Sequence, residues 1–485
     1  MKVKNIIFKN CRFSFETPDK NGIHTGRSIV VSGKKILDIG PAEAIEKRYG
    51  SGPDTEVVDC SDKIVMPGLM DGHNHLCNTH MNMARAFRLD YDNIAKHMLI
   101  TIHNPYGWLT EESIYDISMA SIINDVKHGA TTIENSTILP DTAYRAMDDA
   151  GIRGILAPQM ATSFRLDSEP LNWKQYLAQA ERCIKDYHRP EERMSVAVHI
   201  HDLWDCTERL MTEAYQIAED YDVKYVLHFW EFADAVRRGD ALWPEGAFEH
   251  YMNLGIVTDR SVLFHGSMLQ PEEIERLAET GASVIHNPDI NGTNCGNCAY
   301  IPKMLEAGVN VGLGCDYGSL DVMTSMKLML MIHNIMPRPL KGLDYWEPFK
   351  AATLGTARAY GLEKQTGSLE VGKRADIITI DLKKASHMLP MCTALLDVQP
   401  ELLYFLFTRN CAGTTTAETM VDGQFIRRNG EFTQIDEERY VAKAAEWCEK
   451  CMTDLTDAFR EKHYYARIIH PDFTKDEDIP EETLL

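Results

Sequence analysis

The chain is organised around one stretch, Ile64-Val65-Met66-Pro67-Gly68-Leu69-Met70-Asp71-Gly72-His73-Asn74-His75-Leu76. It joins an apolar run to a Pro-Gly pair and then to two histidines separated by one residue. Side chains alternate faces along a strand, so His73 and His75 project to the same side. Two imidazoles side by side at a strand end can bind one metal ion. The competing interpretation is that both are buried core histidines without a metal. The rest of the sequence distinguishes this interpretation from a metal site.

The composition is that of a globular protein long enough for one large and one smaller domain: 485 residues, 44% hydrophobic and 25% charged. The net charge of −22 argues against nucleic acid or an anionic membrane as a partner. No apolar run reaches the roughly 20 residues needed to cross a bilayer. The first residues lack the apolar core of a signal peptide, and the 12 cysteines therefore indicate reduced thiols in a cytoplasm.

Two Cys-x-x-Cys pairs, Cys295/Cys298 and Cys448/Cys451, could in principle bind zinc together. They lie far apart in the sequence, and neither is surrounded by the knuckle pattern of a zinc ribbon. A structural four-cysteine site is therefore not favoured.

Short β-like runs alternate with polar turns at both ends of the chain. The runs within residues 3–60 predict a small antiparallel sheet. The same alternation of short β-like runs and polar turns recurs in 375–380 and 419–426, where Asp422-Gly423 is a strong hairpin signal. We expect residues 1–62 and 367–435 to build one small β-sandwich domain together, followed by a helical extension and acidic tail over 436–485.

Between the two ends, apolar strand candidates alternate with amphipathic helices such as 112–127 and 271–279. This alternation predicts an α/β fold, a (β/α)8 TIM-like barrel over residues 63–366. The long connection between 77 and 128 should form a lid or substrate loop. The predicted strands are 64–71, 130–134, 152–157, 195–200, 224–229, 261–264, 282–285 and 309–314.

Histidines gather where the predicted strands end, and barrel enzymes carry their catalytic groups at those ends. Five of the eight strand ends have a histidine, although histidine makes up only 18 of 485 residues. This concentration argues against simple core histidines and favours a metal-dependent barrel hydrolase. The ends are His73/His75 on strand 1, His199-Ile200-His201 on strand 4, His228-Phe229-Trp230-Glu231 on strand 5, His265-Gly266 on strand 6, His286-Asn287-Pro288 on strand 7 and Gly314-Cys315-Asp316 on strand 8.

The motif from Pro67 to His75, with His228, His265 and Asp316 at later strand ends, resembles the amidohydrolase superfamily. The similarity runs over nearly the whole chain, including the split sandwich and the closing segment 367–376. Within the superfamily, His228-x-x-Glu231 and His286-Asn287-Pro288 are similar to the branch of purine, pyrimidine, S-adenosylhomocysteine and s-triazine aminohydrolases.

The resemblance implies one divalent metal ion, usually zinc and sometimes iron, bound by His73, His75, His228 and Asp316. A metal-bound hydroxide would attack a ring carbon of the substrate at neutral pH. Binuclear members of the superfamily carry a lysine at the end of strand 4. Here that end reads Val198-His199-Ile200-His201, so a single metal is expected.

The resemblance also implies roles for the remaining strand-end residues. Asp316 would take the proton of the attacking water, and Glu231 would protonate a ring nitrogen and then the leaving amine. His265 would orient the hydroxide or polarise the tetrahedral intermediate. The predicted substrate contacts are His201, Trp108, His286 and Asn287.

Three departures from the family pattern bear on the substrate. The strand-7 loop continues Asp289-Ile290-Asn291, strand 8 ends in Cys315-Asp316-Tyr317, and the predicted lid reads Asn104-Pro105-Tyr106-Gly107-Trp108 in place of a Pro-x-Glu. These changes leave the metal chemistry intact but disfavour a nucleoside thioether as substrate.

The primary hypothesis is hydrolytic deamination of an amino-substituted N-heterocycle of purine, pyrimidine or triazine type. Displacement of chloride, alkylamine or alkylthio from a triazine-like ring is the close alternative, and a non-catalytic scaffold with this fold is the alternative from another class. Glu231 favours deamination, because a nitrogen leaving group needs a proton. The expected partners are the small-molecule substrate and water, and the resemblance implies a homodimer or larger homo-oligomer.

Overall fold

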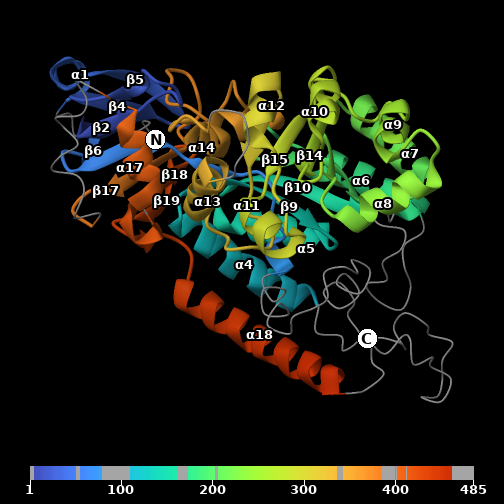
Figure 1. The fold of residues 1–485 in the computed structure, drawn as a ribbon. Coiled ribbons are helices and arrows are strands. Elements are labelled where there is room, and N and C mark those ends of the chain that lie inside the picture. Colours follow the sequence, from blue (N-terminus) through green and yellow to red (C-terminus); the bar gives the residue numbers. More distant parts are fainter. Residues whose placement is uncertain are drawn as a thin grey trace.

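The structure, a computed structural model, describes residues 5–50, 55–78, 110–160, 173–202, 206–335, 342–384 and, except for 400 and 411, 399–460. The segment 79–109, which contains most of the predicted lid and Trp108, and the predicted acidic tail after 460 lie outside these residues. Figure 1 shows strands from both chain ends gathered on one side of a larger body of alternating strands and helices.

Eight parallel strands run around the larger body in the order β16-β15-β14-β13-β12-β10-β9-β8, and the short β11 also pairs with β10. The ring closes between its end strands, where the Gly72 amide donates to the Leu313 carbonyl at 2.8 Å. A parallel bridge between Asn74 and Asp316 continues this closure. The predicted (β/α)8 barrel is confirmed. Its strands are β8 (Leu69–Asp71), β9 (Ala130–Thr137), β10 (Arg153–Met160), β11 (Met194–Val196), β12 (Val198–Asp202), β13 (Tyr225–Phe229), β14 (Ser261–His265), β15 (Ser283–His286) and β16 (Asn310–Leu313).

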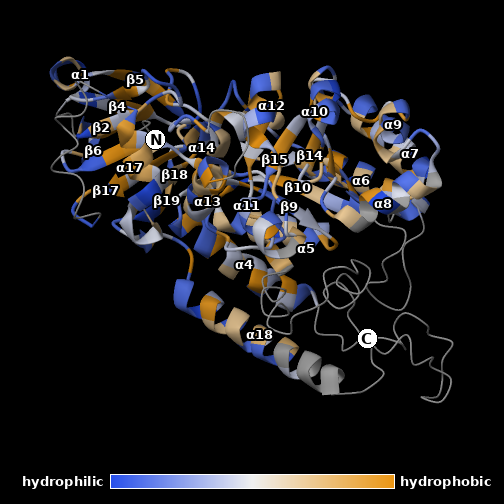
Figure 2. Ribbon diagram, viewed as in Figure 1, coloured by the Kyte–Doolittle hydropathy of each residue, from blue (hydrophilic) through white to orange (hydrophobic). Residues whose placement is uncertain are grey.

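Helices follow the barrel strands and cover them from outside, each burying an apolar face such as Ile274 and Leu277 of α10. Figure 2 shows hydrophobic strands in the interior and helices of mixed hydropathy around them. No helix in the described part of the chain is long and apolar enough to cross a membrane. The larger helices are α4 (Glu111–Lys127), α5 (Pro140–Ala150), α6 (Trp173–Tyr187), α7 (Glu208–Asp220), α8 (Ala233–Leu242), α9 (Ala247–Asn253), α10 (Pro271–Ala278), α12 (Ile301–Ala307), α13 (Val322–Ile335) and α17 (Leu402–Asn410). Shorter helical segments are η1 (Leu76–Asn78), α11 (Pro288–Ile290), η3 (Asn291–Cys295), α14 (Glu347–Lys350), η4 (Ala351–Gly355), α15 (Thr356–Ala359) and η5 (Gly413–Thr415).

Two further sheets are built from the chain ends, as expected. One has the order β5-β4-β1-β6, and the other combines both ends in the order β20-β19-β18-β17-β7-β2-β3. The N-terminal strands are not purely antiparallel, because β6 runs parallel to β1 and β7 parallel to β2. The strands are β1 (Asn5–Cys11), β2 (Phe13–Phe15), β3 (Ile23–His24), β4 (Arg27–Ser32), β5 (Lys35–Pro41), β6 (Thr55–Asp59), β7 (Lys63–Pro67), β17 (Ile377–Asp381), β18 (Thr416–Val421), β19 (Gln424–Arg428) and β20 (Glu431–Phe432), with α1 (Ala42–Tyr49) after β5.

The predicted strand 64–71 is two strands, which corrects the sequence-based assignment. β7 pairs with β17 in the mixed sheet, whereas β8 pairs with β9 in the barrel. Between them Gly68 lies against Thr131, where a Cβ would come within 2.0 Å of the Thr131 Oγ1. The chain can leave one sheet for the other here because glycine alone permits this approach. The predicted strand 195–200 is likewise divided, into β11 and β12. The domain boundaries 62/63, 366/367 and 435/436 stay a prediction.

The predicted hairpin turn at Asp422-Gly423 is confirmed. Val421 pairs with Gln424 across it, and the two central residues have φ of 48° and 75°. Positive φ at both central positions is typical of the type I′ turn, whose twist matches that of the flanking strands.

The C-terminal helix α18 (Glu437–Arg460) packs along α4 on the outside of the barrel (Figure 1). Trp447 Nε1 donates to Asp116 Oδ2 at 3.1 Å, and the Tyr440 and Tyr115 rings meet at an angle with centroids 6.0 Å apart. The sequence left open whether this segment packs on its own barrel or on another subunit. Its N-terminal part covers its own α4.

A buried ion-pair network connects the barrel to the mixed sheet. Arg153 of β10 donates to Asp376, just before β17, at 2.7 Å and to Asp422 of the hairpin at 2.7 Å. All three side chains are buried. Removing Arg153 leaves the buried Asp376 without this cation, while Asp422 keeps only the more distant Lys34 and Arg374, and breaking a buried pair in this way costs about 3–5 kcal/mol.

We therefore expect Arg153→Leu to lower the free energy of unfolding by about 3–5 kcal/mol, measured by chemical denaturation followed by circular dichroism. Arg182→Leu is the matched control, because the Arg182–Asp141 pair is 42% and 56% exposed and such surface pairs contribute about 0–1 kcal/mol. Equal destabilisation by the two variants would contradict the assigned role of Arg153.

Candidate metal centre

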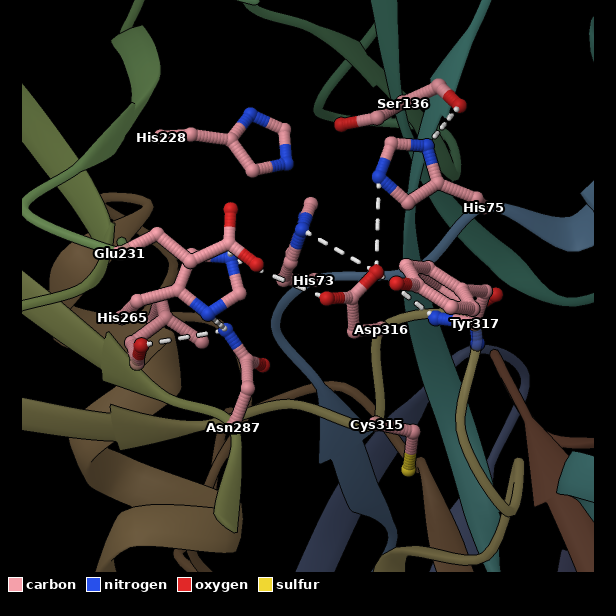
Figure 3. Close-up of polar contacts among 12 residues, drawn as sticks. His73, His75, Ser136, His228, Glu231, His265, Asn287, Cys315, Asp316 and Tyr317 are labelled. Carbon is pink, nitrogen blue, oxygen red and sulfur yellow. Dashed lines mark hydrogen bonds and ion pairs between the residues drawn. The ribbon is translucent and has the colours of Figure 1, made fainter. Parts of the chain in front are cut away.

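Four side chains from distant parts of the chain meet at the carboxyl end of the barrel (Figure 3). His73 and His75 follow β8, His228 lies in β13, and Asp316 follows β16. The Nε2 atoms of His73 and His75 lie 3.7 and 3.5 Å from Asp316 Oδ1. The His228 ring centroid is 4.8 Å from that of His73 and 5.5 Å from that of His75. The predicted ligands are thus neighbours, with their donor atoms facing a common space.

The three imidazoles are oriented by oxygen atoms behind them. His73 Nδ1 lies 3.2 Å from Glu134 Oε2, His75 Nδ1 lies 3.1 Å from the Ser136 carbonyl, and His228 Nδ1 lies 2.6 Å from the His201 carbonyl. A carbonyl oxygen only accepts, so Nδ1 of His75 and of His228 carries the proton. A carboxylate at Nδ1 favours the same tautomer for His73. In all three residues the Nε2 lone pair then faces the centre.

These features fit a metal ion. His73 Nε2 is buried without a hydrogen-bond partner. A buried nitrogen with no partner is unfavourable, and a metal ion would satisfy it by accepting its lone pair. Burial lowers the pKa of His75 to about 3 and the pKa values of His73 and His228 well below 6.5. The imidazoles are therefore uncharged, as metal ligands must be. Three imidazole nitrogens and one carboxylate form a donor set typical of catalytic zinc.

Glu134 is a functional residue that the sequence analysis missed. It is fully buried in the middle of β9, and besides His73 Nδ1 its Oε2 accepts the Asn74 amide at 3.0 Å. The only signal in the sequence was a carboxylate inside an otherwise uncharged strand. Carboxylates in this position behind a metal-binding histidine fix its ring and raise its basicity.

We expect Glu134→Gln to weaken metal binding by about 10–100-fold, because a neutral amide no longer polarises His73. Competition with a chelator of known affinity measures the change. Glu418→Gln is the control, since Glu418 is also buried but pairs with Lys63 in the mixed sheet. Unchanged metal affinity in Glu134→Gln, or an equal loss in both variants, would count against the contact with His73.

His265 differs from the three proposed ligands in its tautomer. Its Nδ1 faces two side-chain amide nitrogens, Asn291 Nδ2 at 3.1 Å and Asn287 Nδ2 at 3.4 Å. An amide N–H only donates, so Nδ1 accepts and the ring proton sits on Nε2. That Nε2 points at Glu231 Oε2 and Asp316 Oδ2, 3.7 Å from each. Like His73 Nε2, this nitrogen is buried and makes no hydrogen bond in the structure, and it lies close enough to His73 and His228 to join a metal-binding group.

The two carboxylates that border the centre differ in their surroundings. Asp316 lies beside the histidines and also accepts the Tyr317 amide at 2.7 Å. Glu231 is buried with few donors, and burial, reinforced by the charges of Asp316 and Asp202, raises its pKa well above 4.5. A carboxyl group whose pKa is raised in this way is suited to act as a general acid.

Two of these residues have a strained backbone conformation. His265 has φ of 74° and Asp316 has φ of 56°, a left-handed region that non-glycine residues rarely adopt. Each costs about 1–3 kcal/mol and persists only where the surrounding structure enforces it. At both positions the side chain points into the centre (Figure 3).

The four predicted substrate contacts fall in different places. The His201 ring lies 4.8 Å from that of His228. Asn287 faces His265, as described above, and His286 contacts His333 and Cys298 behind the centre. Trp108 is outside the described residues. Contact of these residues with a substrate stays a prediction.

A centre of three imidazoles and a carboxylate at the mouth of a (β/α)8 barrel defines a metal-dependent barrel hydrolase. Residues 64–426 match the model of the amidohydrolase family. The chain belongs to this family, and the match confirms the predicted enzyme class, a hydrolase for carbon–nitrogen bonds other than peptide bonds.

Curated relatives match most of the chain. A 5'-deoxyadenosine deaminase of Methanosphaera stadtmanae is 27% identical over 81% of this chain and 89% of its own length. A 5-methylthioadenosine/S-adenosylhomocysteine deaminase of Bacillus cereus is 26% identical over 88% of this chain and 95% of its own length.

Solved structures share the fold. An adenosine deaminase of Xanthomonas campestris with bound zinc has a TM-score of 0.81 at 21% identity, covering 93% of this chain and 99% of that chain. A zinc complex of atrazine chlorohydrolase from Arthrobacter aurescens has a TM-score of 0.75 at 21% identity, covering 91% of this chain and 100% of that chain.

Proposed function

We propose that the chain hydrolyses an amino group from an amino-substituted N-heterocycle of purine, pyrimidine or triazine type, with one divalent metal ion, zinc by preference, at His73, His75, His228 and Asp316. The observation that carries the proposal is the convergence of three oriented Nε2 atoms and a carboxylate beside the buried Glu231, whose pKa burial raises. The relatives named above, which are deaminases of adenine nucleosides, support the same reaction class.

Each residue of the centre has a separate role in the hydrolysis. A divalent cation held by these four residues would lower the pKa of a water molecule beside it and so supply a nucleophile at neutral pH. Asp316 accepts the proton that the attacking water loses. The Nε2–H of His265 donates to the oxygen as it adds to the ring carbon and develops negative charge.

Glu231 supplies the proton that the leaving group requires. Its carboxyl group protonates the ring nitrogen next to the attacked carbon, which makes that carbon more electrophilic. Glu231 then recovers a proton that derives from the attacking water and passes it to the amino group, which leaves as ammonia while the ring carbon keeps the oxygen of water. The net reaction converts a ring C–NH2 and water into a ring carbonyl and ammonia.

Ammonia release from a panel of heterocycles tests the proposal. The zinc-loaded protein would be incubated with aminopurines and adenine nucleosides, aminopyrimidines and aminotriazines, with chlorotriazines alongside. We expect ammonia and the matching oxo product from one of the amino compounds. Chloride release without ammonia would establish the displacement reaction instead. No turnover of any compound by protein with stoichiometric metal would overturn the proposal.

A further inference from the structure

A second group of metal-ligating side chains lies behind the strand-7 end and takes no part in the centre described above. His286 ends β15, His333 lies in α13, and Cys298 follows η3 in the loop between them. All three side chains are buried, with exposed fractions of 0%, 5% and 5%. One ligand atom from each lies within 4.8 Å of the other two.

The polar atoms of this cluster are poorly satisfied by one another. His286 Nε2 faces both His333 Nε2 at 3.3 Å and Cys298 Sγ at 3.7 Å. Both neighbours therefore approach the same ring nitrogen. His286 Nδ1, on the other side of the ring, is buried with no hydrogen-bond partner.

The spacing matches tetrahedral metal coordination. With Zn–N bonds of about 2.05 Å and a Zn–S bond of about 2.3 Å, two tetrahedral nitrogen ligands stand about 3.3–3.4 Å apart and a nitrogen and a sulfur about 3.6 Å apart. The observed separations are 3.3 Å for the two Nε2 atoms and 3.7 Å for nitrogen and sulfur. The third pair, His333 and Cys298, brings its ligand atoms within 4.8 Å of each other, so one ion can reach all three side chains.

We propose that His286, His333 and Cys298 bind a second metal ion, zinc by its preference for mixed nitrogen and thiolate ligands, at a site separate from the catalytic centre. On binding, the Cys298 thiol loses its proton to solvent and the thiolate forms the metal–sulfur bond. Water completes the tetrahedron.

The position of this site gives it a structural role. It would tie the loop after β15 to α13, and that loop carries Asn291, which donates to His265, and Cys295, whose Sγ lies 3.7 Å from Glu231 Oε1. A metal ion at the base of the loop would therefore hold in place the residues that orient the general acid and the donor histidine. The site does not depend on which heterocycle the enzyme accepts.

Cobalt substitution separates the two sites spectroscopically. The catalytic centre offers only nitrogen and oxygen ligands, so a thiolate-to-Co²⁺ charge-transfer band arises outside it, and the Cys298 variant shows whether it comes from the second site. We expect the band in the cobalt-loaded protein and its loss in Cys298→Ser and His333→Asn, each with one equivalent of metal fewer by elemental analysis. Cys295→Ser, from the same loop, should keep the band, and His228→Asn should lose metal from the catalytic centre without losing the band.

X-ray absorption at the zinc edge of the unmodified protein gives a test that needs no variant. We expect a zinc–sulfur path at about 2.3 Å in protein with more than one equivalent of zinc. A full catalytic centre with no further metal and no sulfur neighbour would overturn the proposal. So would a charge-transfer band that survives Cys298→Ser but is lost in Cys295→Ser.

Discussion

Replacing Glu231 with glutamine is expected to lower kcat by about 10²–10⁴-fold while the bound metal stays at its full amount. Glutamine has nearly the same shape but cannot donate the proton that a ring nitrogen and a leaving amine need. Its amide also keeps a hydrogen-bonding group near His265 Nε2, which lies 3.7 Å from Glu231 Oε2. The effect should therefore fall on the chemical step and leave the metal ligands undisturbed. Steady-state kinetics on the best amino substrate, with metal analysis of the same preparation, measures both quantities.

Two comparisons test whether the loss of kcat is due to the lost proton donation by Glu231. Glu245→Gln should leave kcat unchanged, because Glu245 pairs with His250 on the outer surface of the barrel. A substrate with a leaving group that departs without a proton, such as chloride, should lose far less rate in Glu231→Gln than an amino substrate does. Equal losses on both substrates would mean that Glu231 positions the ring and does not donate a proton.

Loss of the catalytic metal is expected to remove activity almost completely. A divalent cation would lower the pKa of bound water enough to make hydroxide available at neutral pH, and no group in the described part of the centre replaces this effect. We expect a chelator to abolish turnover by the unmodified enzyme and added zinc to restore it. His228→Asn should be inactive and should not recover at the same zinc concentration, because one of the three oriented Nε2 donors is missing.

His24→Gln is the control for these measurements, since His24 lies 41% exposed in the mixed sheet, away from the barrel mouth. It should respond to chelator and zinc as the unmodified enzyme does. The circular dichroism spectrum of His228→Asn should be unchanged if His228 contributes to metal binding and not to folding. Full activity of metal-free enzyme would remove the basis for the proposed mechanism.

The Glu231→Gln and His228→Asn variants together separate proton donation from metal binding. Glu231→Gln should bind metal without fast turnover, whereas His228→Asn should retain the Glu231 carboxyl group without a nucleophile. His265 belongs with Glu231 in this scheme, because its ring proton lies on Nε2, opposite the nitrogen that faces Asn287 and Asn291. A metal content that falls in Glu231→Gln as it does in His228→Asn would show that the two functions are not separable.

Local sequence patterns predicted much of this architecture. Period-two histidines after an apolar run indicated one face of a strand end, and the alternation of strands and helices indicated the barrel. Asp422-Gly423 predicted its hairpin because those residues tolerate the positive φ of the turn. The predicted strand 64–71 was wrong because the apolar pattern continues through Pro67-Gly68, where the chain changes sheets.

The sequence by itself determined the residue types at the strand ends, and with them the nitrogen and oxygen donors that a hydrolytic metal requires. Only the tertiary structure decided which nitrogen of each histidine faces the centre, since tautomers depend on oxygens and amides supplied by other strands. Glu134 behind His73, the amide pair behind His265 and the meeting of His286, His333 and Cys298 follow from closure of the barrel and the packing of its loops. Contacts between residues so distant along the chain leave no periodic signal in it, which is why the folded barrel was needed to find them.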